Sequence, residues 1–339
     1  MNIQKAIAHL VDGRDLAQEE AHRIMDRIMS GETTDAQIGA YLTALRIKGE
    51  TVEEITGSAM AMREKALHVK AEGIVIDTCG TGGDGSGTFN ISTTVAFVVA
   101  ASGVNVAKHG NRSISSKSGS ADLLKAMGVN IDADLPVVER CIAETNIGFI
   151  FAPKHHGAMR HVMGPRKELT MRTIFNLLGP LTNPAGAPFQ LIGVYDGDLT
   201  EPMAQVLGRL GSKHALVVHG SDGLDEITTT GPTKISELDR DGNVASYAIE
   251  PEQFGLKRTT MQNLKGGDAE DNAKITKAIL NGEKGPHRDI VTLNAGAALC
   301  VAGSAHDIGS GVELACDLID SGKAIARLDE LIRISNTTA

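Results

Sequence analysis

The sequence predicts an α/β protein: a small N-terminal all-helical domain, then a larger domain with a mostly parallel central sheet flanked by helices. Residues 3–66 carry apolar side chains at helical spacing and contain no strand signal. From residue 74 onward, short β-branched runs alternate with longer amphipathic stretches, which is the pattern of parallel strands joined by helices. We therefore expect a helical domain over residues 1–70 and an α/β domain over residues 71–339.

The helical region is expected to hold four helices, two of which have marked starts. Thr34 with Gln37, and Thr51 with Glu54, have the spacing of a capping box, in which each side chain binds the other residue's backbone amide. Residues 159–185 are also helical in pattern and end in the breaker cluster GPLTNPAG. This later segment is expected to contribute to the helical domain as an insertion.

The sheet is expected to contain five short apolar runs with room for a crossover helix between successive runs. They are residues 74–77, 104–107, 148–151, 191–194 and 215–219. After residue 232 we expect looser strands, including residues 244–248, and two final helices. Only 3% of the residues are aromatic, so the core must be aliphatic.

The first run leads into a segment that we name the glycine loop, residues 80–90. Five glycines fall within eight of its positions: Gly80, Gly82, Gly83, Gly85 and Gly87. The helix that follows, VAFVVAA, can be capped by Ser92, Thr93 or Thr94. Loop amides and a helix N-terminus together attract anionic oxygens, so we expect a phosphate or diphosphate ligand here.

Three other interpretations of the glycine loop are weaker or less specific. Gly80, Gly82 and Gly85 satisfy GxGxxG, but a dinucleotide site needs an acidic residue about 20 positions further on. The sequence at residues 108–112 is KHGNR, which is basic instead. A Walker A loop requires Lys-Ser or Lys-Thr after the glycines, and neither follows here. A surface loop without a ligand remains an alternative on this motif alone.

A second polar segment, which we name the basic loop, covers residues 108–120 with the sequence KHGNRSISSKSGS. It contains three cations and five serines and follows the second predicted strand. Ligands of open α/β sheets bind outside the carboxyl ends of the strands. Two such ends, one supplying amides and the other supplying cations, suit a substrate with more than one phosphate.

The overall charge and the cysteines restrict the possible partners and compartments. The sequence has 33 basic and 42 acidic residues and a net charge of −9, which disfavours nucleic acid or an anionic membrane as partner. Four scattered cysteines without a CxxC pair signal neither a zinc site nor disulfides. The N-terminus lacks a signal-peptide pattern, and no apolar run approaches the roughly 18 residues that span a membrane. We expect a cytoplasmic protein.

Two clusters of ionisable side chains have both structural and functional interpretations. His155, His156 and His161 lie close in sequence, but their spacing favours structural or substrate-contacting histidines over a metal site. Asp225 and Glu226 follow the run at residues 215–219 and could be a solvated acidic turn. Mg²⁺, however, is commonly bound by one or two carboxylates together with substrate phosphates. The acid pair is therefore a candidate magnesium site.

Four ordered motifs resemble the anthranilate phosphoribosyltransferase family: DTCGTGGDGSGTFNIST, KHGNRSISSKSGSADLL, GPRKELTMRTIFNLLGPLTNPAG and GLDEITTTGPT. The resemblance extends over nearly the whole chain. It implies transfer of phosphoribosyl from 5-phosphoribosyl 1-diphosphate (PRPP) to the amine of anthranilate in tryptophan synthesis, with Mg²⁺ as cofactor and a homodimer formed through the helical domain. Gly157 and Thr170 depart from the family pattern, which often has proline and glycine there.

The resemblance also implies site residues. Anthranilate would contact Gly80, Asn111 and Arg166, whose guanidinium suits a planar carboxylate, while Arg172 is a weaker candidate. Magnesium would be bound by Ser92, Asp225 and Glu226. PRPP would be bound by residues of both loops and of the helix start: Gly80, Gly83, Asp84, Thr88, Asn90, Ile91, Ser92, Thr93, Lys108, His109, Gly110, Asn111, Arg112, Ser113, Ile114, Ser115, Ser116 and Ser120.

No covalent or acid/base catalytic residue is expected, because this reaction can rest on positioning and charge stabilisation. Two other functions remain alternatives. A pyrimidine nucleoside phosphorylase would share the architecture but shows a KHSTGG-type first loop. A non-catalytic relative could bind single-stranded nucleic acid through a basic groove, but the net charge of −9 and the acid pair argue against it.

Overall fold

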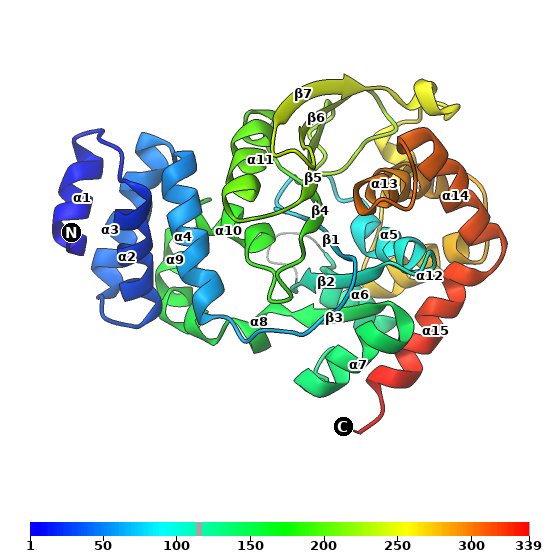
Figure 1. Ribbon diagram of the computed structural model, residues 1–339, viewed down its shortest axis with the longest axis horizontal. Coiled ribbons are helices and arrows are strands. Elements are labelled where there is room, and N and C mark those ends of the chain that lie inside the picture. The colour runs from blue at the N-terminus through cyan, green and yellow to red at the C-terminus, as the bar shows by residue number, and fades with distance from the viewer. Residues whose placement is uncertain (113–116, 339) are drawn as a thin grey trace.

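The structure is a computed structural model that describes residues 1–112 and 117–338. Within this part of the chain, one seven-stranded sheet has the order β3-β2-β1-β4-β5-β6-β7 (Figure 1). β1 to β5 are parallel, whereas β6 and β7 are antiparallel, so the mostly parallel sheet is confirmed. The strands are β1 (Val75–Gly80), β2 (Asn105–Gly110), β3 (Ile147–Phe151), β4 (Phe189–Gly193), β5 (His214–Gly220), β6 (Thr233–Leu238) and β7 (Val244–Ile249).

The N-terminal helices lie at one end of the molecule, shown in blue in Figure 1. They are α1 (Ile3–Val11), α2 (Gln18–Met29), α3 (Asp35–Lys48) and α4 (Val52–Lys65). Both predicted capping boxes form: Thr34 and Thr51 accept the backbone amides of Gln37 and Glu54, each at 3.3 Å. The Gln37 and Glu54 side chains accept the Thr34 and Thr51 amides in return.

A helical segment between β3 and β4 packs against these N-terminal helices. It contains α8 (Ala152–His155), the 3₁₀-helix η1 (Gly157–His161), α9 (Met163–Leu169) and α10 (Phe175–Leu181). α9 contacts α3, η1 contacts α2, and α10 contacts α4. The remaining helices are α5 (Ile91–Ala100), α6 (Ser120–Ala126), α7 (Leu135–Thr145), α11 (Thr200–Arg209), α12 (Ala269–Leu280), α13 (Pro286–Ala302), α14 (Ile308–Asp320) and α15 (Lys323–Ser335).

The expectation of two final helices is wrong, because four helices, α12 to α15, follow β7 within the described residues. Four glycines with positive φ stand between these helices: Gly282 (93°), Gly285 (139°), Gly303 (80°) and Gly322 (74°). Residues with a Cβ rarely adopt such backbone angles, so these glycines permit the turns that separate the helices. The amphipathic pattern alone does not show these breaks.

Two apolar clusters occupy the two faces of the sheet. Leu191 and Leu216 belong to the cluster formed with the helices of the larger domain. Ile192 and Val217, the next residue in each strand, belong to the cluster formed with α1 to α4 and α10. Successive side chains of a strand point to opposite faces, so a single sheet contributes to both cores. The N-terminal helices are therefore held by apolar packing that continues onto the sheet.

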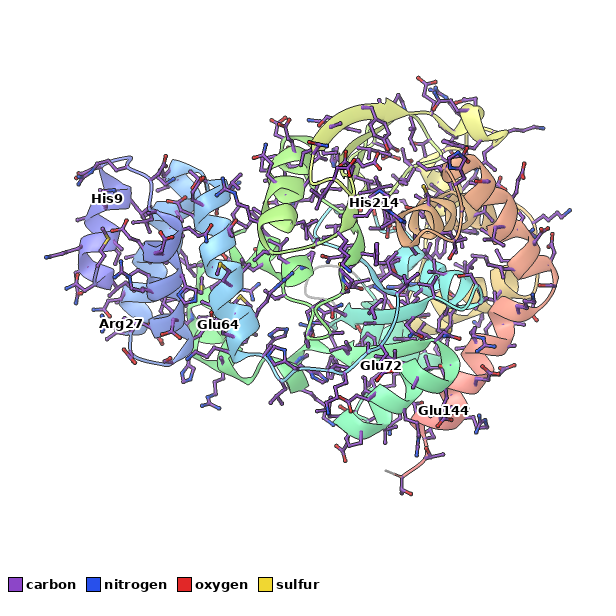
Figure 2. All side chains as sticks on the ribbon, in the orientation of Figure 1. His9, Arg27, Glu64, Glu72, Glu144 and His214 are labelled. Carbon is purple, nitrogen blue, oxygen red and sulfur yellow. The ribbon has the colours of Figure 1, made fainter. Side chains whose placement is uncertain are left out.

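His214, labelled in Figure 2, connects the start of β5 to α13 and to β6. Its ring nitrogens lie 3.1 Å from the Val301 carbonyl oxygen of α13 and 2.7 Å from Glu237 Oε1 of β6. Tyr247 of β7 donates its hydroxyl to the other Glu237 oxygen at 2.9 Å. The hydrogen bond from His214 lowers the pKa of Glu237.

No helix in the described part of the chain is long and apolar enough to cross a membrane.

A pair of buried histidines lies where β2 meets the helical segment. The ring centroids of His109 and His156 are 5.1 Å apart, and neither Nε2 atom has a hydrogen-bond partner within the described residues. Burial, reinforced by nearby positive groups, lowers the pKa of His109 to about 3 and that of His156 to about 4. Both rings are therefore neutral in the folded protein near neutral pH.

This pair predicts a loss of stability in mild acid. The unfolded chain takes up a proton at each histidine near its ordinary pKa of about 6.5, whereas the folded chain does not. The stabilisation is therefore complete above that pH and declines as pH falls toward the folded pKa values. We expect the free energy of unfolding to be lower at about pH 5.5 than at about pH 7.5 by about 1 kcal/mol for each histidine.

Urea unfolding of the wild type and of His156→Gln at both pH values measures this contribution. The variant should lose roughly half of the histidine-dependent decline, whereas His306→Gln, at an exposed position, should keep all of it. An identical pH dependence in the wild type and in His156→Gln would contradict the assignment.

Candidate active site

The acid pair sits directly on the carboxyl ends of two neighbouring strands. Gly80 of β1 and Gly193 of β4 are opposite each other in the parallel register. A Cβ at Gly193 would lie 1.5 Å from the carbonyl oxygen of Asp225, and a Cβ at Gly80 would lie 2.4 Å from Asp225 Oδ2. Only glycine at both positions admits this close approach. Gly80 thus has a structural task in addition to the ligand contact predicted from the sequence.

The same two carboxylates bind the glycine loop and the helix that follows it. Asp225 Oδ2 accepts the amide of Gly82 at 2.8 Å. Glu226 Oε1 accepts the amide of Ser92, in the first turn of α5, at 3.1 Å. Residues separated by more than 130 positions along the chain, 143 and 134 respectively, are thus brought together. The structure joins the predicted glycine loop and the predicted acid pair into one site.

Three carboxylates crowd this site. Burial and the neighbouring Asp84 carboxylate raise the pKa of Asp225 to about 7. Burial and the adjacent Asp225 also raise the pKa of Glu226 well above its ordinary value. Such shifts show that negative charge is insufficiently compensated by the protein itself. A cation bound here would relieve the repulsion.

The donor set fits magnesium better than a metal held by the protein alone. No three His, Cys, Asp or Glu side chains among the described residues converge on a point that could hold a metal ion. Magnesium is usually bound by one or two carboxylates, with substrate phosphates and water completing its octahedron. Asp225 and Glu226 could supply those carboxylates, and the Ser92 hydroxyl belongs to the residue whose amide Glu226 already binds.

The glycine loop has a backbone that other residues could not readily adopt. Gly82, Gly83, Gly85 and Gly87 have φ values of 66°, 75°, 70° and 64°. Each lies in the left-handed region, where a Cβ is unfavourable.

The prediction that Ser92, Thr93 or Thr94 caps the following helix is wrong. α5 begins at Ile91, its N-cap residue is Asn90, and the Asn90 side chain makes no capping hydrogen bond.

Asn90 instead connects the two predicted loops. Its Nδ2 donates to the carbonyl oxygen of Ser118 in the basic loop at 3.1 Å. Its Oδ1 accepts a hydrogen bond from Asn272 of α12 at 3.0 Å. The glycine loop and the basic loop are thus neighbours, as the strand-end argument predicts.

The predicted PRPP contacts near Asn90 differ in burial. Thr88 and Ser92 are half-buried, whereas Ile91 and Thr93 are buried at the start of α5.

The structure corrects the extent of two strands. β1 starts at Val75 and leaves Ile74 47% exposed, and it continues to Gly80. β2 continues to Gly110, which pairs with Phe151 of β3, so Lys108 and His109 belong to a strand and not to a loop. Hydrogen bonding to the neighbouring strands, which a pattern of single-strand hydrophobicity does not show, carries polar residues into the sheet.

Lys108 is consequently buried, with 3% of its surface exposed. Its ammonium donates to the carbonyl oxygen of Thr78. Its charge opposes the rise in pKa that burial causes at Asp77 and Glu226. The described contacts of Lys108 are thus with the protein's own oxygens, and its contribution to binding a diphosphate stays a prediction.

The described part of the basic loop is closed at its base. Ser120 Oγ donates to the carbonyl oxygen of Asn111 at 3.2 Å, and the amide of Ala121 donates to the same oxygen at 3.2 Å. A Cβ at Gly110 would lie 2.2 Å from Ser120 Oγ and 2.7 Å from a ring carbon of Phe149, so a larger residue there would displace both side chains. Arg112 is 3.7 Å from Asp122 Oδ1. The predicted site residues Ser113, Ile114, Ser115 and Ser116 lie outside the described residues.

Two arginines of the helical segment approach the strand ends in different ways. The Arg166 guanidinium is half-buried above the Phe175 ring, 5.2 Å from its centroid. Within the described residues it forms no ion pair and no side-chain hydrogen bond, and burial lowers its pKa. Arg172, in contrast, donates to the carbonyl oxygen of Gly83 and lies 4.0 Å from the centroid of the Tyr195 ring.

The three clustered histidines do not converge on one point. His155 contacts the Leu67 carbonyl oxygen through Nδ1 at 3.2 Å, His156 pairs with His109, and His161 lies against Gly31 of the helical region. The three side chains thus have separate contacts, and contact of any of them with substrate stays a prediction.

Sequence reasoning missed several residues around the glycine loop. Gly193 was not distinguished from other strand residues, although its direct pairing with Gly80 makes it equally necessary. Lys265 donates to the carbonyl oxygen of Ser86, and the amide of Gly266 donates to that of Gly87 at 3.0 Å. In the sequence, only Lys-Gly-Gly at residues 265–267 indicates, and weakly, that this later segment contacts the glycine loop.

Comparison with known proteins agrees with this arrangement over the whole chain. The family model "Glycosyl transferase family, helical bundle domain" matches residues 4–66, and "Glycosyl transferase family, a/b domain" matches residues 72–325. The anthranilate phosphoribosyltransferase of Acetivibrio thermocellus is 56% identical over 336 residues, which are 99% of this chain and 97% of that protein.

Solved structures give the same result. The crystal structure of anthranilate phosphoribosyltransferase from Thermus thermophilus matches with a TM-score of 0.93 and 44% identity, covering 98% of this chain and 99% of that one. The Saccharomyces cerevisiae enzyme in complex with PRPP and Mg matches with a TM-score of 0.90 and 27% identity, covering 99% and 98%. The yeast enzyme is also known in complex with 4-fluoroanthranilate. With the glycine loop, the acid pair and these full-length matches in agreement, the chain belongs to the anthranilate phosphoribosyltransferase family.

Proposed function

We propose that this protein transfers the phosphoribosyl group of PRPP to the amine of anthranilate. The observation that carries the proposal is the acid pair held against the glycine loop by the contacts of Asp225 with Gly82 and of Glu226 with Ser92. In the reaction, the amine nitrogen forms a bond to C1 of the ribose. The bond from C1 to the diphosphate oxygen breaks, its electron pair leaves with diphosphate, and the new secondary amine loses one proton.

The donor substrate is expected at the strand ends. Backbone amides of the glycine loop and the start of α5 suit the diphosphate, because oriented amides bind phosphate oxygens without a net charge of their own. Asn111, Arg112 and Ser120, at the base of the basic loop, suit the ribose phosphate. The developing positive charge on the ribose is best met by a site rich in carboxylates, such as Asp84 and the acid pair.

Magnesium fits as the cofactor of this site. Asp225 and Glu226, with Ser92, would hold it, and the raised pKa values of the two carboxyl groups identify the place where a cation is needed. A bound magnesium ion would supply charge compensation for the departing diphosphate. The chain's own contribution is to hold the two carboxylates at the strand ends through Gly80 and Gly193.

The acceptor is expected beside Arg166. A half-buried guanidinium without a carboxylate partner is unusual, because burial of a charge is costly unless it is paired. Anthranilate carries a carboxylate and an aromatic ring, and Arg166 lies over the Phe175 ring in an apolar setting. The carboxylate of the acceptor would complete this arrangement, while Gly80 and Asn111 stay predicted contacts.

The activity itself is tested by mixing the protein with PRPP, Mg²⁺ and anthranilate and following the fluorescence of anthranilate. We expect fluorescence to fall, with release of diphosphate, only when all components are present. Phosphorolysis of pyrimidine nucleosides, or retention of single-stranded nucleic acid at low salt without transfer activity, would instead support one of the alternative functions.

Arg166 provides the first prediction for this function. Arg166→Ala should raise KM for anthranilate by at least the factor that corresponds to roughly 1.5 to 3 kcal/mol, the worth of a hydrogen bond to a charged group. KM for PRPP should change little, because the side chain contacts only the acceptor. Steady-state kinetics with each substrate varied in turn measure both values, with Lys167→Ala as the neighbouring control. Equal losses for both substrates would exclude this role.

The acid pair, Asp225 and Glu226, provides the second prediction for this function. Asp225→Asn combined with Glu226→Gln keeps oxygen acceptors for the Gly82 and Ser92 amides, so the fold should persist. The loss of two negative charges should reduce turnover at limiting Mg²⁺ by an order of magnitude or more, on the order of 1.4 kcal/mol or greater. Higher Mg²⁺ should restore part of the activity, because substrate phosphates remain ligands. Superimposable magnesium titrations of variant and wild type would mean that the pair does not bind the metal.

We also propose that two copies of the chain associate through the helical region. Val11, Ile47 and Met163 are 71%, 81% and 51% exposed and lie on α1, α3 and α9. These helices pack on one another at the N-terminal end of the molecule (Figure 1). Large exposed apolar side chains on neighbouring helices favour a protein interface, and a second copy is the partner that the family resemblance implies.

Ile47→Asp tests this interface. A carboxylate placed in an apolar contact loses its hydration, so the association of the two copies should weaken by about tenfold or more. Sedimentation velocity over a range of concentrations measures the dimer fraction. Ala245→Asp, which adds the same charge at an exposed position of β7, is the matched control. A dimer of unchanged stability in Ile47→Asp would place the interface elsewhere.

The compartment and the remaining partners stay expectations. All four cysteines are free thiols, which fits a reducing environment such as the cytoplasm. The net charge of −9 favours small anionic substrates bound at a local site over nucleic acid as a partner.

A further inference from the structure

The glycine loop is held by side chains that come from outside the strand ends. Arg172 reaches it from the helical segment and donates to the carbonyl oxygen of Gly83. The same guanidinium lies 4.0 Å from the centroid of Tyr195, which follows β4. Tyr195 is itself attached to the loop, because its amide donates to Thr81 Oγ1 at 3.1 Å. Arg172 is therefore fixed between two partners that belong to adjacent strand ends.

Lys265 reaches the same loop from the C-terminal part of the chain. Its ammonium donates to the carbonyl oxygen of Ser86, three residues beyond the Arg172 contact. Thr88 forms an isolated bridge with Lys265, and the Gly266 amide donates to the Gly87 carbonyl oxygen at 3.0 Å. Two cations from different segments thus bind two carbonyl oxygens of one loop.

Binding a carbonyl oxygen also orients the amide that follows it. A trans peptide unit is planar, and its C=O and N–H point in opposite directions. With the Gly83 carbonyl turned toward Arg172, the amide of Asp84 is turned away from it. With the Ser86 carbonyl turned toward Lys265, the amide of Gly87 is turned away likewise. This control is needed because the four left-handed glycines leave the loop free to adopt many conformations.

The chain segment between Arg166, the predicted anthranilate contact on α9, and Arg172 is short and strained. α9, which carries Arg166, ends at Leu169, and its C-cap residue Thr170 has a φ of 49°. A β-branched residue in the left-handed region is rare and conformationally strained. The surrounding contacts, including that of Arg172 two residues later, maintain this turn.

We propose that Arg172, assisted by Lys265 from the other side, is a positioning residue that sets the glycine loop in the conformation that binds the diphosphate of PRPP. This rests on the proposed function. Arg172 acts through the Gly83 carbonyl group and contacts no substrate atom, so its loss lowers affinity for PRPP without removing a group from the reaction. For the affinity for PRPP, the hydrogen bond that Arg172 donates to the Gly83 carbonyl oxygen matters more than the positive charge of its side chain.

Three variants separate these roles. With Mg²⁺ and anthranilate saturating, Arg172→Ala should raise KM for PRPP about five- to tenfold. This is less than the loss of a buried hydrogen bond to a charged group would cause, because the Arg172 contact with Gly83 is exposed. The value of kcat and KM for anthranilate should stay within about twofold. Arg172→Gln, a neutral donor, should recover a large part of the loss, and Arg172→Lys should recover it partly because its ammonium stacks less well on Tyr195. Lys265→Ala should raise the same KM by a smaller factor.

Arg160→Ala is the matched control, since Arg160 is an exposed cation of the same helical segment whose side chain forms no hydrogen bond or ion pair among the described residues. An unchanged KM for PRPP in both Arg172→Ala and Lys265→Ala would overturn the proposal. Gln as damaging as Ala, with Lys equal to wild type, would also overturn it by showing that charge acts directly on phosphate. A raised KM for anthranilate alone would reassign Arg172 to the acceptor. If the wild-type protein shows no transfer activity, the proposed function itself is refuted. If the wild type is active and the variants have an unchanged KM for PRPP, only the role of Arg172 is refuted.

Discussion

The close approach of Asp225 to Gly80 and Gly193 is the constraint on which the site depends. Two strands end in glycine at the same register position, and Asp225 occupies the space that their side chains would need, with its backbone at Gly193 and its carboxylate at Gly80. From there Asp225 binds the Gly82 amide and Glu226 binds the Ser92 amide. The glycine loop, α5 and the segment after β5 are thereby fixed relative to one another, and a larger residue at either strand end would separate them.

The same packing creates an electrostatic cost that the protein does not fully compensate. Asp84, Asp225 and Glu226 are brought together with Lys108 as the buried cation beside them, and the pKa values of the acid pair rise as a result. A site that binds a magnesium complex of an anionic substrate needs this excess of negative charge. Under the proposed function, this local loss of stability falls at the place where the reaction requires charge compensation. The buried histidines His109 and His156, in contrast, are neutral near neutral pH.

Local signals predicted much of the fold, whereas long-range contacts were not visible in the sequence. The Thr34 and Thr51 capping boxes are encoded within four residues, and both form. The glycine loop and the acid pair could be recognised from residue type and strand position. The burial of Lys108 could not, because it depends on pairing between β2 and β3. The contact of Arg172 with Gly83, 89 positions away, likewise follows only from the packing of the helical segment.

A crystal structure of the protein with PRPP and Mn²⁺ in place of Mg²⁺ tests the central claim most directly, because manganese gives an anomalous signal that locates the ion. The account predicts a peak within coordination distance, about 2.0 to 2.3 Å, of Asp225 or Glu226 oxygens and of diphosphate oxygens at the glycine loop. Diphosphate bound elsewhere, or a manganese peak that contacts neither carboxylate, would contradict it.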